Sequence, residues 1–213
     1  GYAALVEGLV NTFFGYNVSF ISRRLGRGQL DHTLIQPQPL WLSLLTEGFS
    51  PAFGFPTLLP GIAMVSWALA KMQFTVTPGW IGTFVVELAA SVVVVMSFQF
   101  AWGSLAFWAP RAAEEISSST MRLMTQLVKY PLDGLSAGLT SGLLTVLPVG
   151  FLAWAPCRAL LGQAAGIGWM GMEWATPAAA LVFALAAAWV WREGMRHYAR
   201  VGSQRYSGRG FRS

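Results

Sequence analysis

Long apolar segments alternate with short polar ones along this chain. Five segments are apolar over most of the roughly 20 residues that a helix needs to cross a hydrocarbon core. They are residues 1–22, 42–70, 81–108, 134–155 and 174–191. None of them shows the strict alternation of apolar and polar residues that a membrane β-barrel strand requires. The pattern therefore predicts an all-α polytopic membrane protein, in which residues 1–213 form a single transmembrane domain with five apparent transmembrane helices.

The composition strengthens this prediction. Charged residues make up 11% of the chain and hydrophobic residues 54%, whereas soluble domains carry roughly 25% charged residues. So few charges cannot cover a soluble globule of this size. The 10 tryptophans and 23 glycines are also typical of membrane proteins, whose helices pack closely through small residues and carry aromatic side chains at the interfaces.

The basic residues predict an orientation, because cytoplasmic connections of membrane proteins are enriched in lysine and arginine. If residues 23–40 are cytoplasmic, twelve of the 14 basic residues lie on that side, and only Lys71 and Arg158 lie outside. The basic tail, residues 192–213, is then cytoplasmic and can contact anionic lipid headgroups. Since this position already accounts for the arginines, no nucleic-acid partner is predicted.

Several kinds of chemistry are absent from the sequence. Neither lysine follows a glycine, which excludes a phosphate-binding G-x-x-x-x-G-K-[ST] loop. His32, His197 and the single Cys157 are too scattered to form a metal site by spacing. No G-x-S-x-G motif is present either. We therefore predict no catalytic residue and no metal site, and the chain by itself is not expected to be an enzyme.

A polar segment, "RGQLDHTLIQPQP", separates the first two apolar segments. After Gly28, the spacing of Leu30 and Leu34 gives a short apolar stripe, with Asp31 on the opposite face. Pro37 ends such a helix, because proline cannot continue the hydrogen-bond pattern. A short amphipathic helix here could transmit force from a soluble partner. The residues alone equally fit a loop that rests at the interface and sets the topology.

Two other cytoplasmic or external connections have helical character. Residues 110–131 are amphipathic, which fits an extension of the adjoining helices better than a contact with a soluble partner. Residues 156–173 are too rich in glycine and polar residues for a full span. Their flanking tryptophans favour an external helical hairpin that re-enters the membrane over a plain loop.

Glycine spacing marks the fourth apolar segment. Gly134, Gly138 and Gly142 recur every four residues, a pattern that places small residues on one helix face and allows close backbone approach. Ordinary packing within one subunit is the simpler interpretation. The other is an interface that slides, between two subunits or at a gate.

Three glutamates, Glu7, Glu47 and Glu87, lie within predicted spans, and the last two are candidates for a transport pathway. Glu47 and Glu87 are each about one and a half helical turns inside an end. Because an acidic side chain costs at least about 2.5 kcal/mol at the bilayer centre, each is a candidate for a transport pathway. Structural hydrogen bonding is the preferred interpretation for both. The segment that contains Glu47 also contains Pro51, Pro56 and Pro60. These prolines can interrupt the helix, which would give either a gating hinge or only a bend.

Three motifs resemble one family. "RGQLDHTLIQPQPLW" is similar to the pattern G-x-L-D-x-x-L-x-x-P that follows the second span of permeases in the ABC type-2 exporter superfamily. "KYPLDGLSAGLTSGLLTVLPVGFLAWAPCRALLG", residues 129–162, resembles the Y-P motif that opens their fifth span. "WREGMRHYARVGSQRYSG" is similar to their basic tail. The motifs occur in the family's order and together cover nearly the whole chain.

The resemblance implies a permease subunit of six spans in a bacterial inner membrane, which exports a cargo by alternating access. It implies a second permease subunit, identical or different, and a separate ATPase subunit that holds ATP and Mg²⁺, so no cofactor is expected on this chain. Residues 23–40 would be the coupling helix, with Gly28, Leu30, Asp31, Leu34 and Pro37 carrying the motif. The chain would begin inside the family's second span, so that the first span is missing.

Two other classes stay open on the residues alone. A secondary transporter or channel needs charges along a pathway, and neither many such charges nor inverted repeats are visible. A membrane scaffold needs no site. An ATPase partner distinguishes the first interpretation from both, because a permease of the ABC type does not work without one.

Overall fold

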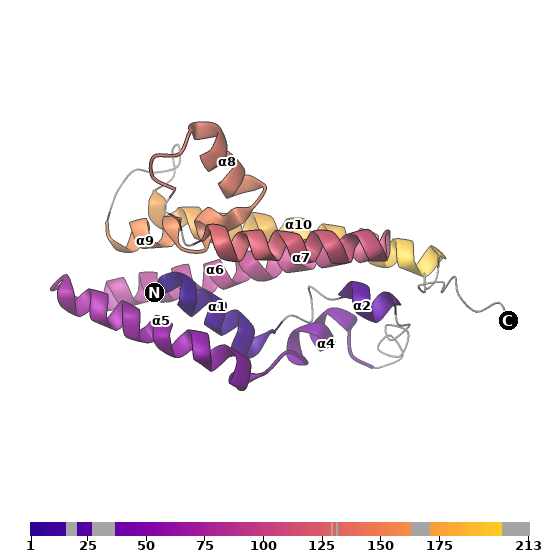
Figure 1. Cartoon of the computed structure of the whole chain (residues 1–213), viewed down its shortest axis with the longest axis horizontal. Coiled ribbons are helices and arrows are strands. Elements are labelled where there is room, and N and C mark those ends of the chain that lie inside the picture. Colours follow the sequence, from indigo (N-terminus) through magenta and orange to yellow (C-terminus); the bar gives the residue numbers. More distant parts are fainter. Residues whose placement is uncertain (16–20, 27–36, 129, 131, 163–170, 202–213) are drawn as a thin grey trace.

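The computed structural model describes residues 1–15, 21–26, 37–128, 130, 132–162 and 171–201, and these are helical apart from their connections (Figure 1). No strand occurs among them, so the prediction of an all-α membrane protein is confirmed. The elements are α1 (Tyr2–Phe13), α2 (Ile21–Gly26), α4 (Leu40–Thr46), α5 (Pro51–Lys71), α6 (Pro78–Ser104), the 3₁₀ turn η1 (Leu105–Phe107), α7 (Pro110–Leu127), α8 (Ala137–Thr145), the 3₁₀ turn η2 (Pro148–Phe151), α9 (Trp154–Leu160) and α10 (Met172–Val201).

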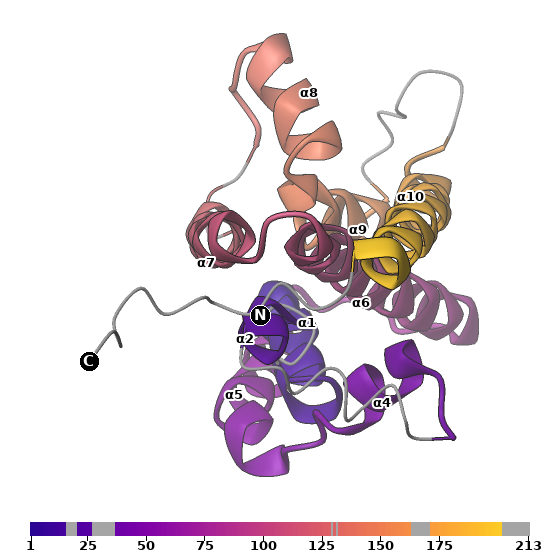
Figure 2. The same cartoon turned by 90° about the vertical axis from the view of Figure 1, so that its right-hand side faces the viewer.

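Helices α6 and α10 pack closely along their length and run in the same direction (Figures 1 and 2). Near the start of α6, the Trp80 indole donates a hydrogen bond to the Leu160 carbonyl at 3.0 Å, shortly before α10 begins. Near its end, Phe107 packs on Trp191 and on Tyr198, with ring centroids 5.4 and 5.8 Å apart. The intervening chain therefore returns from the Phe107 end to the Trp80 end.

A second closely packed pair consists of α1 and α5 (Figure 1). Glycine makes the close approach possible, because a Cβ atom at Gly8 would lie 2.6 Å from Leu58 Cα and one at Gly54 would lie 2.6 Å from Thr12 Cα. Helix α5 packs on the rest of the chain chiefly through α1, and α1 in turn packs on α6. The opposite side of α5 exposes large apolar side chains, among them Phe53 and Trp67.

Three described helices are long and apolar enough to cross a membrane: Pro51–Lys71, Pro78–Phe107 and Glu173–Val201. A fourth candidate arises if Ala137–Thr145 and Pro148–Leu160, which meet at 70°, count as one span. Apolar side chains cover the outward surfaces of the long helices, as expected where lipid replaces water as the solvent. The protein is an integral membrane protein.

The first two predicted spans differ from the observed helices. Helix α1 ends at Phe13 after 12 residues, a rise of about 18 Å. Residues 42–70 do not form one helix, because α4 ends at Thr46 and α5 begins at Pro51. Proline is favoured at the first helical position, because an N–H group there would have no hydrogen-bond partner within the helix. The break thus lies before the proline series, and α5 continues through Pro56 and Pro60.

The fourth predicted span also differs, because residues 134–155 fold back. Asp133 and Arg158 flank this segment, and their side chains form an ion pair at 3.0 Å, whereas a straight span would hold its ends roughly 30 Å apart. The reversal follows from Pro148. Its ring forces Leu147 into an extended conformation (φ −117°, ψ 99°), which ends α8.

Helix α7 does not extend its neighbours, which corrects the preferred interpretation of residues 110–131. The chain turns at η1, and Pro110 begins a separate helix that runs back along α6 (Figure 1). Met124 of α7 is buried in a cluster with Phe98 of α6 and Val149 of η2. Together α7, α8 and α9 return the chain to the level of Trp80.

Candidate functional site

The predicted coupling segment is only partly within the described residues. Pro37 lies there, in an exposed bend before α4, so the chain is not helical at this position. Gly28, Leu30, Asp31 and Leu34 lie outside the described residues. Their assignment to a coupling helix stays a prediction.

Two ion pairs connect the residues before this segment to other elements. Arg23 of α2 contacts Glu114 of α7, with Nε 2.6 Å from Oε1. Arg24 contacts Glu47, which follows α4, with Nη1 2.7 Å from Oε2. The first pair connects α2 to the helix that packs on α6, and the second connects it to the junction before α5. Arg23 and Arg24 therefore connect α2 both to α7 and to the junction before α5.

Glu47 and Glu87, the two pathway candidates, occupy different environments. The side chain of Glu47 is 41% exposed and paired with Arg24, which fits a structural role. Glu87 of α6 is fully buried, and its carboxyl oxygens accept no hydrogen bond from any described residue. Thr176 of α10 lies beside it, but the two side chains do not meet in hydrogen-bond geometry.

A polar network surrounds the next turn of α6. The Ser91 hydroxyl donates to the Phe151 carbonyl at 2.8 Å, and the Tyr2 hydroxyl lies 3.1 Å from Ser91 Oγ. This network joins α1, α6 and η2. No sequence pattern predicted this network, because a single serine and a single tyrosine in apolar segments are common. No three His, Cys, Asp or Glu side chains converge into a metal-binding group in the described part of the chain.

The three regularly spaced glycines do not share one helix face. Gly134 precedes α8 in a turn with φ +90°, which glycine adopts without strain. Gly138 and Gly142 lie on α8, and a Cβ atom added to either would have no neighbour within 4 Å in the described structure. Gly138 and Gly142 therefore make no close contact with another described helix, and their role in packing stays a prediction. The close approaches occur instead at Gly8, Gly54 and Gly61.

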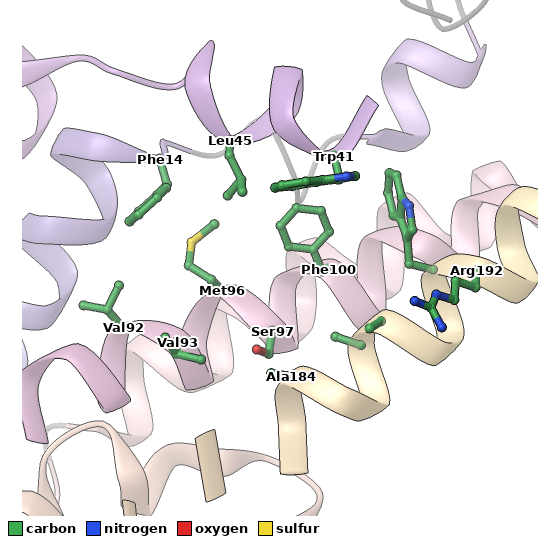
Figure 3. A pocket seen from close by; sticks show the side chains of 13 residues that line it. Phe14, Trp41, Leu45, Val92, Val93, Met96, Ser97, Phe100, Ala184 and Arg192 are labelled. Atoms are coloured by element: carbon green, nitrogen blue, oxygen red, sulfur yellow. The ribbon is translucent and has the colours of Figure 1, made fainter. Parts of the chain in front are cut away.

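An apolar cavity of about 480 Å³ lies between α1, α4, α6 and α10. Phe14, Trp41 and Leu45 form one wall and face Met96 and Phe100 across the space, while Arg192 of α10 lies at one end (Figure 3). We call this space the Arg192 cavity. Its lining residues come from four separate segments, so no local motif could have predicted it.

Comparison with known proteins is consistent with these membrane features. Residues 1–202 match the family model described as "ABC-2 family transporter protein". Neither the search of curated proteins nor that of solved structures gives a match. The family match covers nearly the whole chain, including the two flanking ion pairs and the parallel α6–α10 pair. The chain therefore belongs to the ABC-2 family of transporter proteins and is a membrane component of an ABC transporter.

Proposed function

We propose that the chain is the permease subunit of an ATP-driven exporter. Family membership over residues 1–202 is the observation that carries this proposal. A separate ATPase subunit would bind ATP and Mg²⁺, and a second permease subunit, identical or different, would complete the path. The protein would lie in a bacterial inner membrane with its C-terminus in the cytoplasm.

The distribution of basic residues supports this orientation. Helix α2, with Arg23 and Arg24, packs on η1, and the last turns of α10, with Arg196 and Arg200, pack on the same end of α6. Two basic segments far apart in the sequence thus gather at one end of the molecule. Since lysine and arginine accumulate on the cytoplasmic side, we place this end in the cytoplasm.

The coupling step would begin at residues 23–40. Closure of the ATPase dimer would displace this segment, and the Arg23–Glu114 and Arg24–Glu47 pairs would pass the displacement to α7 and to the start of α5. These helices would then rearrange relative to the second subunit, so that the path opens alternately to the cytoplasm and to the outside. The open space at Gly138 and Gly142 leaves that face of α8 accessible to a second subunit.

Co-purification tests the proposal. The full-length protein is isolated from its native membranes in a mild detergent, and bound subunits and ATP hydrolysis are measured. We expect an ATP-binding cassette protein with the wild type and its loss from an Asp31→Arg, Leu34→Glu double variant that is still monodisperse. Trp41→Phe, just beyond the motif on α4, is the control and should keep the ATPase. If the intact wild-type complex contains no ATPase, the exporter proposal is refuted.

A further inference from the structure

We propose that the Arg192 cavity binds one anionic phospholipid, with an acyl chain in its apolar part and the phosphate group on Arg192. This inference does not depend on coupling to an ATPase, because it rests on the cavity alone. The cavity volume, about 480 Å³, falls within the range of roughly 300–1,000 Å³ that is typical of ligand sites.

The walls of the cavity suit hydrocarbon. Along α6 the lining runs from Val92 to Phe100, and along α10 from Ala184 to Arg192. Each stretch rises about 12 Å, close to the depth of one hydrocarbon leaflet, about half of roughly 30 Å. Ser97 is the single uncharged polar side chain among the lining residues, and it is buried. Most of the bound molecule must therefore be apolar.

The charge lies at one end only. Arg192 lies near Phe100, and Val92 lies at the other end (Figure 3). Among the residues that the structure describes, Arg192 has no ion-pair partner, since its neighbour Glu193 is paired with Arg196 at 2.6 Å. A guanidinium group matches a phosphate well, because it can donate two parallel hydrogen bonds.

The charged end also has the residues of a membrane interface. Trp191 packs edge-on against Phe100, with centroids 5.5 Å apart, and Trp41 lines the opposite wall with 47% of its side chain exposed. Tryptophan favours the headgroup level of the bilayer. A small soluble anion would use Arg192 but none of the apolar wall, whereas an anionic phospholipid uses both.

Native mass spectrometry tests this site on the full-length protein with the subunits that purify with it. The delipidated complex is titrated with palmitoyl-oleoyl phosphatidylglycerol, or with phosphatidylcholine of the same chains. We expect a preference of about fivefold for phosphatidylglycerol in the first bound lipid, which corresponds to about 1 kcal/mol for one basic residue near a lipid surface. Inorganic phosphate should not displace this lipid.

Two variants separate the charge from the apolar wall. Arg192→Gln should bring the preference close to one, and Ala188→Trp, which fills the cavity, should weaken both lipids. The controls are Arg200→Gln and Ala186→Trp, exposed positions of α10 that do not line the cavity, and they should behave as wild type. If Ala188→Trp aggregates, Arg192→Gln decides alone, because its exposed side chain is not needed for folding.

Three results would overturn the proposal. An unchanged preference in Arg192→Gln would place the lipid elsewhere. Displacement of the bound lipid by inorganic phosphate would show that Arg192 binds a small anion. Loss of the permease dimer in Ala188→Trp, with lipid binding unchanged, would assign the cavity to a second copy of the chain.

Discussion

The contact between α1 and α5 allows a quantitative test at Gly8. In Gly8→Ala the new Cβ would lie 2.6 Å from Leu58 Cα, 2.7 Å from Leu58 Cβ and 2.7 Å from Leu58 N. None of these atoms can move away by a side-chain rotation, so the helices must separate. Overpacking typically costs about 1–3 kcal/mol, and the rigid contacts here favour the upper value.

Helix propensity opposes this cost and has to be subtracted. Alanine is favoured over glycine by about 1 kcal/mol in a helix interior, which leaves a net loss of about 2 kcal/mol for Gly8→Ala. A domain of this size shifts its melting temperature by about 2–4 °C per kcal/mol, so a fall of about 4–8 °C is expected. Gly142→Ala is the matched control, since it is also helical but its Cβ would meet nothing within 4 Å.

The assay heats detergent-solubilised protein and measures the monodisperse fraction by size-exclusion chromatography. Gly142→Ala should be as stable as wild type or more stable, by up to about 4 °C. If Gly8→Ala is no less stable than Gly142→Ala, the close approach of α1 and α5 is refuted. A Gly142→Ala variant that folds but loses its dimer would place this glycine at the subunit interface.

Three further predictions concern charged side chains. Arg24→Glu should reduce permease-stimulated ATP turnover with little loss of stability, because exposed ion pairs contribute only about 0.2–1 kcal/mol. Adding Glu47→Arg should restore the turnover. If it does not, the Arg24–Glu47 pair has no part in coupling. Glu87→Gln should match or exceed wild type in melting temperature, since a buried carboxylate without a partner is costly. Glu87→Lys should abolish folding. If both variants fold as well as wild type, the side chain of residue 87 is not buried. Cysteines placed singly at Asp133 and Arg158, in a background without the native cysteine, should react with an impermeant maleimide from the same side of the membrane. Labelling from opposite sides would instead show that residues 134–155 cross the membrane as a straight span.

The hydrophobic pattern predicted the helical membrane fold correctly, but not the positions at which the helices end or reverse direction. The apolar runs at 81–108 and 174–191 overlap α6 and α10, because in lipid an apolar segment of that length can satisfy its backbone groups only as a helix. The reversal at Pro148 was not predicted, because a proline restricts the residue before it but does not fix the direction in which the chain continues. The ion pair between Asp133 and Arg158, which shows the reversal, joins residues far apart in sequence. Composition reports the preference for lipid, but not the direction in which a helix continues after a proline.

The same distinction applies to the candidate site. Glu87 was found because a charge within an apolar segment is conspicuous. Its burial beside Thr176 could not be found in this way, because Thr176 belongs to α10, far along the sequence. Spacing at Gly134, Gly138 and Gly142 suggested close packing, but spacing alone cannot show whether another helix lies opposite. The Arg192 cavity required four segments to converge, which is tertiary information.

The narrow attachment of α5 has a mechanical consequence. Helix α5 is held by α1 on one side and exposes apolar side chains on the other. If the α1–α5 pair rocks as a rigid body about the α1–α6 contact, most of its surface only exchanges one lipid neighbour for another, at little cost in solvation. The resistance to such a stroke would come from the small contact between α1 and α6, so modest forces applied at the cytoplasmic end could produce a large lateral displacement.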